Sequence, residues 1–306
     1  MLSSETGVVQ HRLSPSQPGA RLDRFIVEQV PDIARTQAQR LIEDGFVTVN
    51  GSMEKAGHKL RAGDSVLVRV PPPVPSHLAA EDIPVPILYE DEDVLVVDKP
   101  AGLTVHPAPG HPGGTLVNAV LGHLKDIAAE DGRPGIVHRL DRDTSGVMVI
   151  ARNQKAHADL ADQFKRHTVT KVYLALVEGR LVPEQGIIEA HIGRDSGDRK
   201  KMAVSVESRG RAARTQYRVM RYADGYTLLE VRPETGRTHQ IRVHLAAIGY
   251  AVVGDATYGV KSQAVARQFL HAHRLGFRLP SSGEYREFTS PLPGDLTQAL
   301  KQIERL

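Results

Sequence analysis

The stretch HRLDRDTSG, residues 138–146, places several ionisable groups between two apolar runs. The runs at 135–137 and 147–150 have the composition of strands, so we expect a charged site held where strands end. If the segment is extended, Arg139, Asp141 and Asp143 share one face. Two carboxylates would suit a glycosidase, which needs an acid and a second carboxylate at a set separation.

The two carboxylates have different neighbours in the sequence. Asp143 stands directly before Thr-Ser-Gly at 144–146, a pattern typical of a turn in which an aspartate bonds nearby backbone. We therefore interpret Asp143 as structural and Asp141 as the reactive carboxylate. The alternative for Asp141 is a structural ion pair with an arginine.

A second charged stretch is ETGRTHQIRVH, residues 234–244. We predict a helix over 238–248, with Thr238 as N-cap and a glycine at 249 that stops it. Arg237 and Arg242 lie around its first turn, where the helix dipole disfavours cations. Their presence predicts a compensating anion, which is either a phosphate at the helix start or the carboxylate of Asp141.

A third stretch is KVYLALV, residues 171–177, which alternates as a strand does. Lys171 and Tyr173 then point to the same side. Taken alone, Tyr173 is a core aromatic with a hydrogen-bonded hydroxyl. With a nucleic-acid substrate, it is a stacking platform for a base.

The elements that must position these residues follow no regular strand–helix alternation. We predict helices over 115–124 and 153–166, capped by Thr115 and Asn153. Strands are expected at 147–151, 169–177, 212–220 and 226–232, with a hairpin formed by 87–89 and 94–97. This order favours an α+β fold with a mixed, mainly antiparallel sheet.

The N-terminal part has a different pattern. Residues 1–19 are polar and are expected to form a flexible tail. Over 20–70 we predict two short helices, the second capped by Thr36, and then strands with an Asn-Gly hairpin turn at 50–51. Residues 71–86 begin with a proline-rich run that favours an extended linker. The remaining chain, 87–306, forms the larger domain.

Composition limits the classes of function. Cysteine is absent, which excludes disulfides and thiolate metal sites. His239 and His244 are five residues apart, not the four that align two ligands on a helix, so no metal site is predicted. The first 20 residues lack a signal-type apolar run, and no stretch is long enough to span a membrane. We therefore expect a cytoplasmic protein with no membrane partner.

Charge is nearly balanced overall but uneven along the chain. The net charge is +3. Residues 194–221 hold nine basic and three acidic residues, a local charge of +6. Such clustering favours a phosphate-binding surface, and a solvated hairpin is the alternative.

Six motifs in order resemble the RluA family of RNA pseudouridine synthases, most closely its RluD-like branch. They are DKPAGLTVHP at 98–107, GTLVNAVL at 114–121, RPGIVHRLDRDTSGVMVIAR at 133–152, KVYLALVEG at 171–179, ETGRTHQIRVHLAAIG at 234–249 and GDATYG at 254–259. The resemblance implies a pseudouridine synthase fold and conversion of uridine to pseudouridine in RNA, without cofactor or metal. The implied substrate is 23S ribosomal RNA of the large subunit, and the implied state is a monomer.

The resemblance also implies roles for individual residues. Asp141 matches the essential aspartate, Tyr173 the active-site tyrosine, and Arg242 the basic residue that pairs with the aspartate. Arg139 matches the arginine that fills the gap left by the flipped uridine. Further RNA contacts are expected from His138, Arg142 and Arg237. The alternatives are a pseudouridine synthase that acts on transfer RNA and a catalytically silent RNA-binding factor in ribosome assembly.

The N-terminal stretch resembles the ribosomal protein S4-like RNA-binding domain, through ARTQAQRLIEDGFVTVNG and LRAGDSVLV. Family members often carry serine at the position of Ala34, so the helix start is expected to differ slightly. The resemblance implies an RNA-facing surface that includes Arg35, Arg40, Lys55 and Lys59. The alternative is that these side chains only keep a small domain soluble.

Overall fold

The computed structural model describes residues 9–30, 33, 35–71, 78–107, 113–124, 134–195, 197–198, 201–206, 208, 210–259, 262 and 265–303. The chain divides into two compact units, Met1–Ser76 and His77–Leu306. The boundary falls within the predicted linker, most of whose proline-rich run lies outside the described residues. None of the described helices combines the length and the apolar composition needed to cross a bilayer.

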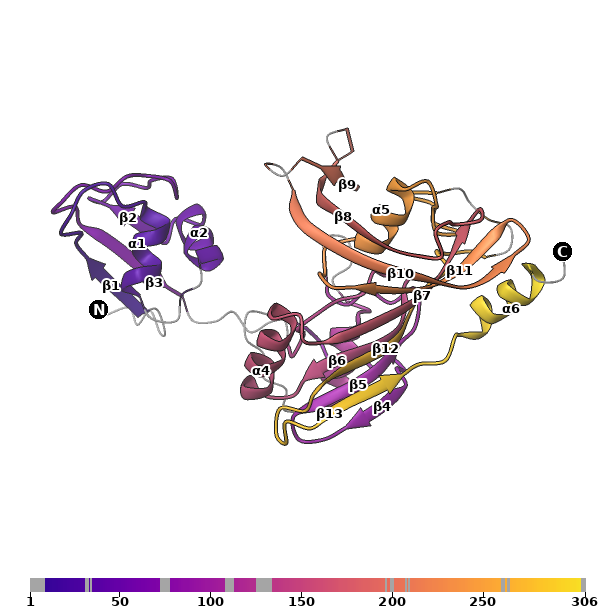
Figure 1. Cartoon of the computed structure of the whole chain (residues 1–306). Helices are drawn as coiled ribbons and strands as arrows, with labels where there is room; N and C mark the ends of the chain where they lie inside the picture. Colours follow the sequence, from indigo (N-terminus) through magenta and orange to yellow (C-terminus); the bar gives the residue numbers. More distant parts are fainter. Residues whose placement is uncertain are drawn as a thin grey trace. The chain divides into compact units, whose positions relative to one another are not determined.

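The N-terminal unit packs two helices against a small sheet (Figure 1). Helix α1 is Leu22–Gln29 and α2 is Arg35–Glu43; strands β1 (Val9–Leu13), β3 (Val66–Val70) and β2 (Val47–Val49) lie in that order in the sheet. Between β2 and the bridge at Ser52, Asn50 and Gly51 have φ of 51° and 85°. These are the positive values that a tight Asn-Gly turn requires.

Two details of this unit correct the sequence-based prediction. Strand β1 lies inside the stretch 1–19 that we expected to be a flexible tail, and it pairs antiparallel with β3. It covers a sheet edge that would otherwise expose backbone groups, and its polar composition carries no signal of that pairing. Helix α2 includes Thr36 and begins at Arg35, so Thr36 is not its N-cap.

The second unit is built on one mixed sheet of ten strands within the described residues. Its order is β4-β5-β6-β12-β7-β11-β10-β8-β9, with β13 paired to β12. Only the contact between β6 and β12 is parallel among the paired strands, as an α+β fold with a mainly antiparallel sheet requires. The strands are β4 (Ile87–Glu90), β5 (Val94–Lys99), β6 (Ser145–Ala151), β7 (Thr170–Glu178), β8 (Gln185–Arg194), β9 (Met202–Ser205), β10 (Arg211–Ala223), β11 (Tyr226–Pro233), β12 (Leu270–Arg278) and β13 (Tyr285–Thr289).

Helices pack on this sheet and contribute apolar side chains to its hydrophobic cores. Helices α3 (Leu116–His123) and α4 (Gln154–Lys165) begin at the predicted caps, whose side chains accept backbone N–H groups. Helix α6 (Gly294–Ile303) buries three apolar side chains in the core beneath β7 and β11. Helix α5 is Gln240–Ala247, with His239 rather than Thr238 at its N-cap position. The prediction of a Thr238 cap was therefore wrong.

The order of the central strands brings distant parts of the chain together. Strand β12 lies between β6 and β7, so Ala272 pairs with Gly146 on one side and with Tyr173 on the other. Gly146 has φ of 121°, and a Cβ there would clash with the carbonyl oxygen of Ala272. Glycine thus permits the close approach that places the loop before β6 beside Tyr173.

Candidate active site

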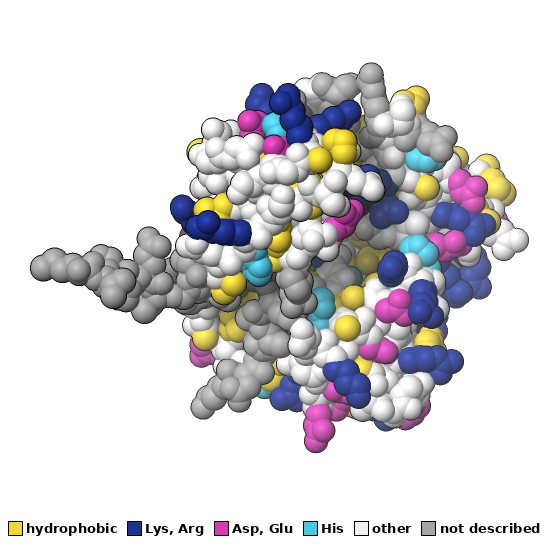
Figure 2. Space-filling view, turned by 90° about the vertical axis from the view of Figure 1, so that its left-hand side faces the viewer, with side chains coloured by type: hydrophobic (Ala, Val, Ile, Leu, Met, Phe, Trp, Pro, Cys, Tyr) yellow, Lys and Arg dark blue, Asp and Glu magenta, His cyan; other side chains and the backbone are white. Residues whose placement is uncertain are grey.

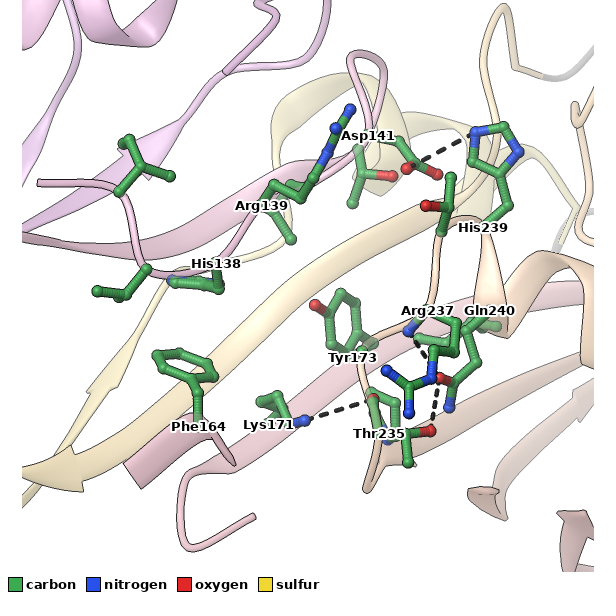
Figure 3. Close-up of a pocket in the computed structure, with 18 of the residues that line it drawn as sticks. His138, Arg139, Asp141, Phe164, Lys171, Tyr173, Thr235, Arg237, His239 and Gln240 are labelled. Carbon is green, nitrogen blue, oxygen red and sulfur yellow. Dashed lines mark hydrogen bonds and ion pairs between the residues drawn. The ribbon is translucent and has the colours of Figure 1, made fainter. Parts of the chain in front are cut away.

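A cavity of about 890 Å³ opens among three of the stretches singled out in the sequence. Its walls come from the loop before β6, from β7, from the C-terminal part of α4, and from the loop that leads into α5. In Figure 3, His138, Arg139 and Asp141 follow one another along one wall, and Lys171 and Tyr173 lie on the facing strand. The predicted residues Arg237 and Arg242 also line this cavity.

Arg242 joins two carboxylates at the cavity wall. Its Nη1 donates to Oδ2 of Asp141 at 2.9 Å. Its Nε and Nη2 donate to the two oxygens of Asp255 at 2.6 and 2.8 Å. The side chain of Asp255 is 0% exposed and that of Asp141 is 20% exposed. The anion predicted from the cations around α5 is therefore a pair of carboxylates, and Asp141 is the one that faces the cavity.

The electrostatics favour the charged forms of Arg242 and Asp255. Burial alone would lower the pKa of Arg242, but hydrogen bonds and charges from Asp255 and Asp141 outweigh it and raise that pKa. Burial would raise the pKa of Asp255, and its bonds with Arg242 and with backbone N–H groups instead lower it. Opposite charges at hydrogen-bonding distance favour the charged form of both partners.

Backbone contacts hold the loop that carries Asp141. The N–H of Thr144 donates to the carbonyl of Asp141, so the loop turns here and residues 139–143 do not form one extended face. The buried ammonium of Lys99 donates to the carbonyl of Arg142 at 3.0 Å, and burial lowers the pKa of Lys99 to about 8. Arg267 donates to the carbonyl of Asp143 at 2.9 Å. Side chains from the end of β5 and from the segment before β12 thereby fix the loop that positions the carboxylate.

Two side chains of β7 face the cavity as the alternation predicted. The ring of Tyr173 packs partly against the neighbouring cores. Burial raises the pKa of its hydroxyl, and the charge of Asp141 adds to the effect, so the phenol stays protonated at neutral pH. Lys171 donates to the carbonyl of Glu234 at 2.9 Å, and burial lowers its pKa to about 8. Lys171 thereby ties β7 to the loop before α5.

That loop is held from inside by Gln240. Its Oε1 accepts from the N–H of Arg237 at 3.0 Å and from the hydroxyl of Thr235 at 2.7 Å. Its Nε2 donates to the carbonyl of Arg214 and to the hydroxyl of Thr215. Because the Gln240 side chain bonds back to the loop, helix α5 starts one residue later than the Thr238 cap would allow.

The expected RNA-binding residues of this unit occupy different settings. Arg139 and Arg142 are exposed, and Arg142 pairs with the Asp143 carboxylate at 3.1 Å. His138 stacks on Phe164, with ring centroids 4.6 Å apart, and its Nε2 accepts from the N–H of Val149. Burial lowers the pKa of His138 to about 3, so its ring is neutral.

Further basic residues belong to the N-terminal unit and to the basic stretch 194–221. Arg40, Lys55 and Lys59 are exposed in the N-terminal unit, and the side chain of Arg35 lies outside the described residues. In the basic stretch 194–221, Arg214 pairs with Glu189 and Glu234. Figure 2 shows Lys and Arg interspersed with Asp and Glu over the visible face. The two ion pairs of Arg214 therefore neutralise part of the positive charge of the stretch 194–221.

Sequence reasoning missed several residues at this site. Asp255 and Tyr258 lie in the GDATYG motif, and His239 lies in the stretch before α5, yet none of them received a role. The acidic residue within a glycine-flanked motif was the available signal for Asp255. Within the described ranges, no group of three or more His, Asp or Glu side chains is arranged to hold a metal ion.

Comparisons with known proteins identify the family of this chain. Residues 93–247 match the model of the RNA pseudouridylate synthase family, and residues 20–66 match the S4 domain. The chain is 51% identical to an uncharacterized RNA pseudouridine synthase of Chloroflexus aurantiacus, over 99% of this chain and 96% of the relative. It is 40% identical to the ribosomal large subunit pseudouridine synthase D of Zymomonas mobilis, over 96% of this chain and 97% of the relative.

A solved structure supports the fold. The human RNA pseudouridylate synthase domain containing 1 matches 69% of this chain and 84% of its own length, at 30% identity and a TM-score of 0.57. The expected fold class and family are confirmed. The chain therefore belongs to the RNA pseudouridylate synthase family, with an S4 domain at its N-terminus, and it is an enzyme that forms pseudouridine in RNA.

Proposed function

We propose that this enzyme isomerises uridine in large-subunit ribosomal RNA, with Asp141 as the carboxylate that reacts. The position of Asp141 carries the proposal: it faces the cavity beside Tyr173 and is held by Arg242, which is itself fixed by Asp255. The names of relatives from Zymomonas mobilis and Xanthomonas campestris, both ribosomal large subunit pseudouridine synthases D, support the substrate. We also propose that the enzyme acts in the cytoplasm, where this substrate would lie, and that it acts as a monomer.

The chemistry requires a bond to break and another to form without loss of the base. The glycosidic N1–C1′ bond breaks, the uracil turns, and C5 bonds to C1′. C5 then loses its proton, and N1 gains one. One carboxylate suffices as nucleophile or base because the uracil stays in the cavity and no water has to be activated. The hydrogen bond from Arg242 holds the Asp141 carboxylate in place while the substrate enters the cavity.

The base must first leave its stack, which costs a few kcal/mol. Arg139 is exposed at the edge of the cavity beside Asp141, so it is positioned to occupy the gap in the RNA. Tyr173 offers an aromatic face to the flipped uracil. His138, Arg142 and Arg237 are proposed to contact the flanking RNA, and Arg40, Lys55 and Lys59 to provide further contacts from the S4 domain.

A tritium-release assay tests the reactive residue. RNA labelled at uracil C5 loses tritium when C5 bonds to C1′, so release reports each turnover. Asp141→Asn is expected to abolish release and to leave RNA binding largely intact. Asp143→Asn is the matched control, since it removes a carboxylate of the same loop that pairs with Arg142, and it should retain turnover. Retained turnover in Asp141→Asn would refute the assignment.

The substrate is tested separately by mapping pseudouridine in RNA from a strain that lacks the gene. Loss of one or more pseudouridines from 23S ribosomal RNA is expected. Loss of pseudouridine confined to transfer RNA would instead show that the enzyme modifies transfer RNA. No loss in either RNA would exclude both substrates.

A further inference from the structure

His239 occupies an unusual position beside the reactive carboxylate. Its backbone is left-handed, with φ of 55°, immediately before α5. Left-handed backbone is uncommon outside glycine and persists where neighbouring contacts enforce it. The Nε2 atom of its half-buried ring lies 3.8 Å from Oδ1 of Asp141, the oxygen opposite the one that Arg242 holds (Figure 3).

The hydroxyl of Tyr258 determines which nitrogen of this ring carries the proton. Nδ1 of His239 lies 2.8 Å from that hydroxyl, whose oxygen also accepts the N–H of Met202 at 2.9 Å. The hydroxyl has one proton to donate, and donation to Nδ1 satisfies both groups. Burial lowers the pKa of His239, so the ring is neutral and its remaining proton is on Nε2. The N–H therefore faces the Asp141 carboxylate.

The separation of 3.8 Å is too long for a direct hydrogen bond. The donor Nε2–H and the acceptor Oδ1 instead stand side by side at the cavity wall. A single hydroxyl group can serve both, because it accepts one hydrogen bond and donates another. An oxygen about 2.9 Å from each atom closes a triangle with the observed separation.

We propose that His239 and Asp141 together bind the ribose 2′-hydroxyl of the target nucleotide, with His239 as donor and Asp141 as acceptor. The inference rests on the proposed function, since a carboxylate that reacts at C1′ or at the adjoining C2′ must lie against that edge of the sugar. The 2′-hydroxyl is both donor and acceptor, and it is the group by which a protein distinguishes RNA from DNA. His239 is then a residue that determines specificity for ribose.

The test compares two labelled transcripts of 23S ribosomal RNA, one with ribose and one with 2′-deoxyribose at every uridine. Single-turnover tritium release gives the preference for ribose in each enzyme. His239→Asn tolerates the left-handed backbone and should lower that preference about threefold to tenfold, the effect of one net hydrogen bond. The two transcripts can fold differently, but that difference is the same for every enzyme and cancels in the comparison.

Two further variants sharpen the result. Tyr258→Phe leaves the His239 ring in place but removes the proton donor to Nδ1, and it should also lower the preference for ribose. His167→Asn is the matched control, because His167 also has a left-handed backbone (φ 58°) and lines the cavity; it should keep the wild-type preference. Circular dichroism checks that each variant is folded. If His239→Asn does not fold, Tyr258→Phe still tests the inference.

The outcomes separate this inference from the proposed function. An unchanged preference for ribose in both His239→Asn and Tyr258→Phe, in otherwise active enzymes, overturns the role of His239 alone. Tritium release by Asp141→Asn overturns the proposed function instead. If turnover of the deoxy transcript is undetectable in every enzyme, filter-binding dissociation constants of the two transcripts give the same comparison.

Discussion

Arg242 and Asp255 form a buried two-point ion pair, in which Nε and Nη2 of the arginine each donate to a different carboxylate oxygen. The third nitrogen of the guanidinium, Nη1, donates to the carboxylate of Asp141. Asp255 also accepts the N–H groups of Thr257 and Tyr258. The planar fork of an arginine suits such an arrangement, and a lysine cannot reproduce it.

Replacement of Asp255 by Asn should therefore affect both stability and turnover. Removing one partner of a buried pair costs about 3–5 kcal/mol of unfolding free energy, because the other charge stays buried. Misplacement of Arg242 should lower kcat about 100-fold, since small displacements of catalytic groups have effects of that size. Urea unfolding and tritium release measure the two quantities. Asp162→Asn, which breaks the exposed pair between Asp162 of α4 and Arg166 just after that helix, should change stability by less than about 1 kcal/mol. Wild-type kcat in a folded Asp255→Asn enzyme would show that the pair does not position Arg242.

Gly146→Ala should disrupt the approach of β6 to β12. The added Cβ clashes with the carbonyl of Ala272, so the loop of Asp141 must shift relative to Tyr173. We expect a strong loss of tritium release together with a lower melting temperature. Gly102→Ala is the control, because Gly102 also has a positive φ (85°) but open space around its Cβ position. That variant should lose only about 1–2 kcal/mol of unfolding free energy, the cost of a side chain in left-handed backbone. Equal effects of the two substitutions would mean that the close approach is unimportant.

His138 predicts how stability depends on pH. Its folded-state pKa of about 3 lies below the ordinary value of 6.5, so between these values the unfolded chain binds a proton that the folded protein does not. Stability is therefore lost as the pH falls below about 6.5. By pH 5 this group should contribute a loss of about 1–2 kcal/mol. In the His138→Gln variant, the new side chain can still accept from the N–H of Val149 but does not titrate. The difference in unfolding free energy between wild type and His138→Gln should shrink from pH 7 to pH 5, and a constant difference would contradict the prediction.

The S4 domain should contribute to affinity through phosphate contacts. Removal of residues 1–70 is expected to weaken binding to 23S ribosomal RNA and to flatten its dependence on salt. Lys59→Gln, a single exposed charge in that domain, should reduce the slope of log K against log salt by about 0.7–0.9 if it contacts a phosphate. Lys301→Gln removes one exposed charge on α6 and is the control. An unchanged slope after removal of the whole domain would mean that the domain has another role.

Local patterns in the sequence determined the elements and the main candidates. Thr115 and Asn153 were recognisable as caps because a cap depends on residues within one helical turn. The alternation around Tyr173 predicted its strand and the side it shares with Lys171. Two arginines around the start of α5 indicated a nearby anion, which proved to include Asp141. The family motifs identified the enzyme because they lie in continuous stretches of chain.

Only the tertiary structure decided how these pieces meet. The pairing of β1 with β3, the insertion of β12 between β6 and β7, and the contact of Asp255 with Arg242 join residues through the folded chain rather than by local periodicity. The left-handed backbone of His239 likewise depends on Tyr258 and on the bonds that Gln240 makes within the loop. Local propensity describes a residue and its neighbours in sequence. The geometry of the site depends on hydrogen bonds and steric contacts between segments that only folding brings together.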